Sequence, residues 1–324
     1  MTDPFGSIVV MTQAALDSTR ITFDCTNCRA TTDAFTGTMR EAQRLCRNCV
    51  AKRKDMRPRE LNDLTGAEWA QSSKSVQEFP DTRSEKQRLH GAAYPQSLAS
   101  QQIAKYTMKG QTVLDPFAGV GTTLDACVEL GRNGVGIELN DQYRELALAD
   151  LPKDGTQVLI SGDSLHLNEL VKPDSVDMVM TSPPYGALLK HVKGAFGYKW
   201  QEHSRIAPIR NPLPYSDDSR DLGNMPYAEY LTAITQVMGN TMMVMKSGAY
   251  AVWVVKDFRA SKEKIPFVPF HMHIADCAAE AGLKLWDIQI WDQTRFRPLV
   301  CLGYPSKNYY HNIGHSYNMI FRKP

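Results

Sequence analysis

Short apolar runs alternate with amphipathic stretches along the chain from His90 onward. The apolar runs have the length of buried strands, and they fall at residues 113–114, 134–139, 158–160, 176–180 and 249–256. Helical periodicity separates them, at residues 122–130, 142–149, 227–245 and 271–281. Two last apolar segments, 283–291 and 317–322, follow each other without a helix between them. This order predicts an α/β fold with a seven-stranded, mostly parallel, doubly wound sheet and an antiparallel edge.

The first part of the chain has a different pattern. Residues 50–90 are polar and charged, and one helical stretch is expected at residues 66–76. Upstream of them, Cys25, Cys28, Cys46 and Cys49 form two Cys-x-x-Cys pairs with 17 residues between the pairs. Two such turns can enclose a single ion in a closed tetrahedron, which is the spacing of a zinc ribbon. We therefore predict a zinc-ribbon-like module over residues 1–60, with a structural Zn²⁺, and a larger domain over residues 61–324.

Composition adds bounds to this picture. The chain has 324 residues and a net charge of +2, yet its cationic residues are concentrated in two segments. Residues 40–59 hold eight Lys and Arg against two acids, and residues 186–216 hold five against one. Such segments suit a polyanionic partner. No apolar run reaches the roughly 18 residues of a membrane span, no secretory signal is evident, and the seven cysteines suit a reducing cytoplasm rather than a disulfide framework.

The strand at residues 113–114 leads into the turn Asp-Pro-Phe-Ala-Gly-Val-Gly-Thr-Thr of residues 115–123. Glycines in a strand-to-helix turn let the backbone approach a ligand at the carboxyl edge of the sheet. Glu138 ends the next strand, where an acid can hold ribose hydroxyls. A dinucleotide fingerprint would need a third glycine where Leu124 stands, and the acid before the turn suits an amino-bearing ligand better than a pyrophosphate.

Ser182-Pro183-Pro184-Tyr185 follows the strand at residues 176–180 and is the most specific stretch of the sequence. Two prolines stiffen the turn, so that a hydroxyl, a carbonyl and an aromatic face can be presented together. Two oxygen atoms that accept hydrogen bonds from an aromatic amino group would pull its nitrogen toward tetrahedral geometry and make the lone pair available for attack. Tyr185 would stack on the aromatic ring that carries the amine. The tetrapeptide therefore predicts catalytic roles for Ser182, Pro183, Pro184 and Tyr185.

Together these motifs resemble the amino-methyltransferases of DNA, the adenine-N6 and cytosine-N4 family, over roughly residues 62–324. The resemblance implies a class I methyltransferase fold with S-adenosyl-L-methionine as cofactor. It implies that His90 and Tyr94 lie in a segment that closes over the methionine part and that Asp163 lies near the adenine. The full implied set of cofactor contacts is His90, Tyr94, Asp115, Phe117, Ala118, Gly119, Gly121, Thr122, Thr123, Glu138, Leu139 and Asp163. Serine at the first catalytic position is associated in this family with cytosine N4.

The expected partner is double-stranded DNA, in the cytoplasm of a prokaryotic or phage-like context, and the resemblance leaves room for a partner restriction nuclease. Residues 186–225 would form a DNA-contacting insertion, through Lys190, Lys193, Lys199, Arg205 and Arg210. His271 and His273 are expected to pack or to lie at the surface rather than to bind a ligand.

Several alternatives stay open from the sequence. The target is cytosine N4 or adenine N6 of DNA, and related enzymes use the Pro-Pro-Tyr turn on RNA guanine or on glutamine. The alternative to an enzyme is a DNA-binding protein with a zinc ribbon, in which the methyltransferase domain is only weakly active. Carbon-5 methylation is excluded because it needs a Pro-Cys nucleophile, and the chain has no Pro-Cys pair.

Overall fold

The computed structural model describes residues 20–26, 28–36, 40, 44–50, 60–80, 82–187, 218–260, 264–297, 302, 305 and 307–324. The chain divides into two compact units, Met1–Glu60 and Leu61–Pro324. In the first unit, β1 (Arg20–Asp24) pairs antiparallel with β2 (Thr31–Phe35). Residues 51–59 lie outside the described residues, and they hold five of the eight Lys and Arg of the cationic segment 40–59.

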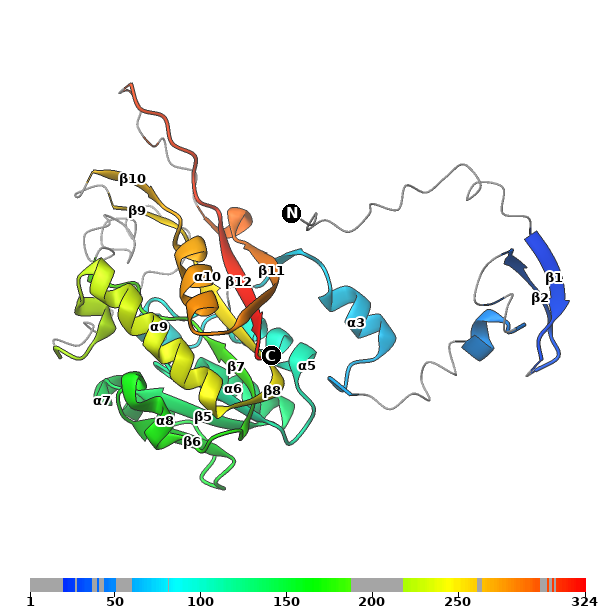
Figure 1. The fold of residues 1–324 in the computed structure, drawn as a ribbon, viewed down its shortest axis with the longest axis horizontal. Helices are drawn as coiled ribbons and strands as arrows, with labels where there is room; N and C mark the ends of the chain where they lie inside the picture. The colour runs from blue at the N-terminus through cyan, green and yellow to red at the C-terminus, as the bar shows by residue number, and fades with distance from the viewer. Residues whose placement is uncertain are drawn as a thin grey trace, which may run out of the picture. The chain divides into compact units, whose positions relative to one another are not determined.

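The second unit is built on one large sheet with the strand order β3-β11-β12-β8-β7-β4-β5-β6 (Figure 1). The strands β4 to β8 run parallel to one another, and β12 runs antiparallel to both β8 and β11. This confirms the predicted α/β sheet with its antiparallel edge. The strands are β3 (Val76–Glu78), β4 (Thr112–Asp115), β5 (Asn133–Glu138), β6 (Gln157–Ser161), β7 (Val176–Thr181), β8 (Met245–Val255), β11 (Lys284–Asp292) and β12 (His315–Arg322).

The prediction of seven strands was wrong by one, because β3 joins the sheet at its edge. The helix expected at residues 66–76 ends early, as α3 (Gly66–Ser72), where the Ser72 and Ser73 hydroxyls donate back to helix carbonyls. The chain then pairs parallel with β11 at Ile290–Asp292. A three-residue strand shows no periodicity, and its partner lies more than 200 residues away, so local pattern could not reveal it.

Alternation along the strands gives the sheet two apolar faces. On β7, Val179 belongs to a core with α9 (Tyr227–Val244) and α10 (Phe270–Glu280), and these two helices lie alongside each other (Figure 1). Met178 and Met180 belong to a second core with α5 (Gln96–Tyr106) and α6 (Thr122–Leu130). Helices thus cover both faces and leave the strand ends open to ligands. Among the described residues, no helix is long and apolar enough to span a membrane.

Candidate active site

The expected site residues follow the carboxyl ends of adjacent parallel strands. The chain leaves β4 toward β5 and β6 on one side, and later returns to β7 and β8 on the other side of β4. The strand order therefore reverses between β4 and β7, the position where open α/β sheets bind ligands. The turn after β4 carries the glycine motif, and the turn after β7 carries Ser182-Pro183-Pro184-Tyr185.

Asp115 joins these two turns. Its carboxyl is 2% exposed and accepts hydrogen bonds from Thr181 Oγ1 at 2.6 Å, Thr123 Oγ1 at 2.5 Å and the Phe117 amide at 3.0 Å. The Tyr94 hydroxyl donates to it as well, at 3.3 Å. Burial raises the pKa of Asp115, and these donors act against that shift. Because both carboxyl oxygens are engaged inside the protein, Asp115 holds the turns together rather than facing outward.

The glycine turn is shaped by two residues with positive φ, Gly119 at +52° and Gly121 at +83°. A Cβ on Gly119 would lie 3.0 Å from His90 Nε2, and a Cβ on Gly121 would lie 3.0 Å from the Ala147 Cβ. A side chain at either position would therefore be strained and would have to displace its neighbour. Gly121 caps α6, so the first amides of that helix open onto the turn.

Glu138 closes the other side of this turn. Its Oε2 accepts from the Gly119 amide at 2.7 Å and its Oε1 from the Asn140 amide at 2.8 Å. Burial raises the pKa of Glu138 to about 7, although both hydrogen bonds favour the ionised form. Leu139 follows directly and is half-buried. The end of β5 thus places a carboxyl group beside the glycine backbone.

The segment after Ser84 packs over the same turn. In α4 (Glu85–His90), Gln87 donates to Thr122 Oγ1 at 3.0 Å and to the Tyr94 carbonyl at 3.2 Å. The His90 ring lies against Tyr143, with 4.6 Å between ring centroids. Burial lowers the pKa of His90 to about 4, so the ring is neutral near pH 7. The structure therefore brings His90 and Tyr94 to the glycine turn, although they precede it by about 25 residues.

Asp163 lies in the turn after β6, and Phe117 lies in the turn after β4. The Asp163 carboxyl caps a short helix, η2 (Ser164–His166), by accepting from the Leu165 amide at 2.9 Å. The neighbouring Ser164 hydroxyl donates to the Pro116 carbonyl. Phe117 packs edge-on against Trp253, with 6.1 Å between ring centroids. The Ser164 bond ties the turn after β6 to the turn after β4, and the Phe117 contact packs the latter turn against β8.

The catalytic tetrapeptide is held by bonds to neighbouring elements. The Ser182 hydroxyl donates to the Val254 carbonyl at 2.8 Å, so its lone pairs remain as acceptors. The Pro184 carbonyl accepts from the Tyr230 hydroxyl at 2.5 Å. No donor to the Pro183 carbonyl occurs among the residues that the structure describes. Ser182 Oγ thus keeps its lone pairs beside the Tyr185 hydroxyl, and the Pro183 carbonyl is the acceptor of this turn with no donor among the described residues.

The Tyr185 ring leans on the aromatic core below the turn. It lies 4.7 Å from the Phe270 ring centroid and 6.0 Å from that of Phe258. Burial raises the pKa of Tyr185, while hydrogen bonds from the Lys256 backbone and the Ser182 side chain act in the opposite direction. The planes of the Tyr185 and Phe270 rings form an angle of 33°, so Phe270 covers one face of Tyr185. A planar ligand would therefore have to stack on the other face of Tyr185.

Comparisons with known proteins point to one family. Residues 32–149 match the family model described as DNA methylase. The Type II methyltransferase M.MthZI of Methanothermobacter thermautotrophicus is 38% identical over 84 residues, which are 26% of this chain and 21% of that protein. M.SmaI of Serratia marcescens is 47% identical over 58 residues, 18% of this chain and 20% of that protein. The matches therefore span about a fifth of these relatives' own length.

The match to the DNA methylase model includes the glycine turn and Glu138. Over residues 32–149 the chain is therefore similar to DNA methylases. Among solved structures, TrmN of Thermus thermophilus shares 14% sequence identity with a TM-score of 0.44, over 74% of this chain and 52% of that chain. None of these comparisons separates the N4 from the N6 branch of the family.

A second polar cluster of the second unit lies directly after β8. Asp257 is 2% exposed and accepts from His271 Nδ1 at 2.7 Å and from the Tyr317 hydroxyl at 3.1 Å. The His271 and Tyr317 rings stack, with 4.2 Å between centroids. Burial, together with the nearby charge of Arg297, lowers the pKa of Lys256 to about 7. Sequence reasoning expected His271 to pack or to lie at the surface and assigned no site role to Asp257 or Tyr317; the signal for Asp257 was an acid close after a strand.

The five cationic residues expected to contact DNA all fall within residues 188–217, which lie outside the described residues. A hairpin follows β8, with two residues between them. It consists of β9 (Phe258–Ala260) and β10 (Ile265–Val268). The Arg259 guanidinium lies 5.0 Å from the Tyr310 ring centroid and donates to the His311 carbonyl at 2.8 Å. This bond ties the hairpin to the segment that carries Tyr309, which is 79% exposed.

Proposed function

We propose that this chain transfers a methyl group from S-adenosyl-L-methionine to an exocyclic amino group of a DNA base, with cytosine N4 as the favoured target. The observation that carries the proposal is the hydrogen bond from Thr181 to Asp115. It joins the end of the strand before the Ser-Pro-Pro-Tyr turn to the start of the glycine turn. Donor and acceptor of the methyl group would meet where these two turns meet.

The residues around the glycine turn fit the cofactor. Gly119 and Gly121 have positive φ and lie close to His90 and Ala147, and glycines in such a turn let the main chain come into direct contact with a ligand. Glu138 would accept hydrogen bonds from ribose hydroxyls, as an acid at the end of this strand does in nucleotide sites. Asp163 would lie near the adenine, and the segment of His90 and Tyr94 would cover the methionine part. When bound, the cofactor supplies an electrophilic methyl group on its sulfonium.

The catalytic turn offers the two acceptors that an aromatic amine needs. Its lone pair is delocalised into the base, so attack requires the nitrogen to become more tetrahedral. The Ser182 oxygen would accept one amino hydrogen, because the hydroxyl proton is already directed at the Val254 carbonyl. The Pro183 carbonyl would accept the other, since Tyr230 occupies the Pro184 carbonyl instead. Tyr185 would stack on the base with the face away from Phe270.

A base paired in a duplex hides its amino group in a hydrogen bond, so the target nucleotide would have to leave the stack and enter the site. Lys190, Lys193, Lys199, Arg205 and Arg210 would hold the surrounding phosphates. This would make binding strongly dependent on salt. The relatives' names are those of Type II methyltransferases, and a partner nuclease for this chain remains a prediction.

The test is mass spectrometry of digested DNA after incubation of the full chain with cofactor. We expect N4-methylcytosine from the wild-type chain. Tyr185→Ala should lower turnover by about 100-fold or more, because positioning supplies most of the rate, while calorimetry shows cofactor still bound. Pro183→Ala should likewise nearly abolish methylation, and Ser182→Ala should be impaired less because the Pro183 carbonyl remains.

Tyr185→Phe is the matched control for the ring, since it keeps the stacking surface and the packing against Phe270. N6-methyladenine as the product would keep the enzyme class and replace the choice of base. Cofactor binding without any methylated base would favour a DNA-binding protein with an inactive domain. Full activity in Tyr185→Ala would overturn the mechanism.

A further inference from the structure

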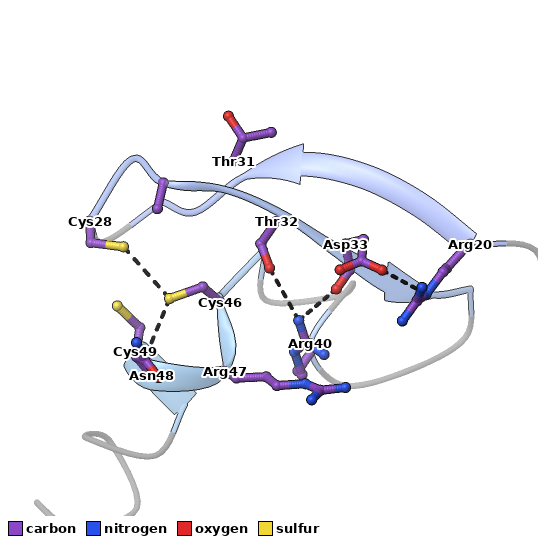
Figure 2. Close-up of a pocket in the computed structure, with 11 residues that line it drawn as sticks. Arg20, Cys28, Thr31, Thr32, Asp33, Arg40, Cys46, Arg47, Asn48 and Cys49 are labelled. Carbon is purple, nitrogen blue, oxygen red and sulfur yellow. Dashed lines mark hydrogen bonds and ion pairs between the residues drawn. The ribbon is translucent and has the colours of Figure 1, made fainter.

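Four cysteine side chains of the first unit converge on one point. Cys25 and Cys28 lie in the connection between β1 and β2, and Cys46 and Cys49 lie at the start of the helical residues 47–50. Their four Sγ atoms all lie within 4.8 Å of one another. Figure 2 shows the sulfur atoms of Cys28, Cys46 and Cys49 turned toward one another.

The spacing of these sulfurs fits a metal ion better than disulfides. Cys28 Sγ and Cys46 Sγ are 3.6 Å apart, whereas a disulfide holds its sulfurs about 2.05 Å apart. Four thiolates around zinc, each with a Zn–S bond of about 2.3 Å, form a tetrahedron with edges of about 3.8 Å. The observed separation is close to such an edge, and it joins one Cys-x-x-Cys pair to the other.

The backbone around the cysteines is arranged to hold thiolates. The Cys49 amide donates to Cys46 Sγ at 3.4 Å, a contact that stabilises negative charge on the sulfur. The Thr26 amide donates to the Arg44 carbonyl at 2.9 Å and so ties the two cysteine loops together. Arg40 and Arg47 line a pocket that Cys28, Cys46 and Cys49 also line (Figure 2). Their positive charges would offset the net negative charge of zinc with four thiolates.

The apolar core among the described residues of the first unit is small. The buried cluster there consists of Leu45 with three of the cysteines, and Val50 packs against it. Small modules with such a core commonly depend on a metal or on covalent links. A ligated ion would supply the missing stabilisation, because metal binding free energy becomes folding free energy.

We propose that Cys25, Cys28, Cys46 and Cys49 bind a single structural zinc ion. All four positions of the tetrahedron are filled by protein sulfur, so the ion has no open position for water or substrate. The site is separate from methyl transfer, whose proposed residues all belong to the second unit.

The test is metal analysis of the full chain, purified under reducing conditions from zinc-supplied medium. We expect one equivalent of zinc, and a cobalt-substituted chain should show the visible absorption of a tetrahedral thiolate site. Cys28→Ser and Cys46→Ser should lose the metal. Cys277→Ala is the matched control, since that buried cysteine lies in α10, and it should keep a full equivalent. Cys28→His replaces an exposed ligand by another zinc ligand and should restore metal binding.

Three results would overturn the proposal: a wild-type chain without zinc after this purification, stoichiometric iron in its place, or full zinc in Cys28→Ser. Calorimetry of cofactor binding on the same variants keeps this test separate from the proposed function. Loss of zinc with unchanged cofactor affinity supports the structural site whether or not the chain methylates DNA.

Discussion

Burial of the Glu138 carboxyl raises its pKa to about 7, so the charge of this group changes in the neutral range. A raised pKa favours the protonated form in the folded chain. This stabilising contribution is complete below the ordinary carboxyl pKa and is lost as the pH rises through 7. Ribose hydroxyls would donate to the ionised form, so cofactor affinity should change in the opposite direction.

We therefore expect cofactor affinity, measured by calorimetry, to weaken by about tenfold between about pH 8 and about pH 6. Glu138→Gln cannot ionise and should bind weakly with a flatter pH dependence. Comparison of the two chains removes the titration of the cofactor's own amino group. Identical pH profiles in the two would show that Glu138 does not contact the ligand.

Gly119 gives a second prediction at the residue scale. Gly119→Ala should place its Cβ 3.0 Å from His90 Nε2 and so displace the ring that packs over the turn. We expect cofactor affinity to fall by at least about tenfold, or about 1.4 kcal/mol, with the fold retained. Gly110→Ala is the matched control, since Gly110 has φ of +82° and no atom within 4 Å of its Cβ position. Equal affinity in both variants would count against the assigned turn.

Sequence reasoning at this scale found residue types more readily than their contacts. The two motifs identified Asp115, Glu138 and Ser182 because their order along the chain is informative. The order of residues did not reveal that the buried Asp115 carboxyl accepts four hydrogen bonds, or that Asp257 accepts from His271 and Tyr317. Those contacts join residues that are distant in sequence, and only the sheet order brings them together.

At the scale of elements, a buried aromatic contact follows β3 where the strand joins the sheet. Phe79 follows the strand, is 3% exposed, and packs edge-on against Trp291 with 6.5 Å between ring centroids. Phe79→Ala should lower the free energy of unfolding by about 3–5 kcal/mol, the usual cost of such a truncation in a core. Val76→Ala, at a side chain 54% exposed, should cost under about 1 kcal/mol. Thermal denaturation of both variants measures the difference.

Long periodic elements were predictable and short ones were not. The helix expected at residues 227–245 is α9 (Tyr227–Val244), and the strand expected at 283–291 is β11 (Lys284–Asp292). Both carry a repeated apolar pattern over many residues. The three residues of β3 carry none, and their pairing is set by the Ser75 carbonyl accepting from the Ile290 amide at 2.7 Å. Tertiary contacts therefore decided the edge of the sheet.

At the scale of the whole molecule, the division into two units predicts separable functions. All proposed cofactor residues lie in Leu61–Pro324. A chain that starts at residue 61 should bind S-adenosyl-L-methionine within about twofold of the full chain, or within about 0.4 kcal/mol. Calorimetry on the two chains is the measurement, and circular dichroism checks that the shorter chain is folded. A loss of binding in a folded short chain would mean that the first unit contributes to the site.

The pairing of β3 with β11 constrains the order in which the protein can fold during synthesis. Residues 76–78 leave the ribosome early, but their partners, Ile290–Asp292, are made only after more than 200 further residues. The Gln102 side chain likewise waits for Gln289, to which it donates at 2.6 Å in the interior. Until then the segment before β4 has no sheet edge to join, and pairings so distant in sequence form slowly. A nascent chain would therefore hold the glycine turn and the catalytic turn before it could close the far edge of the sheet that carries them.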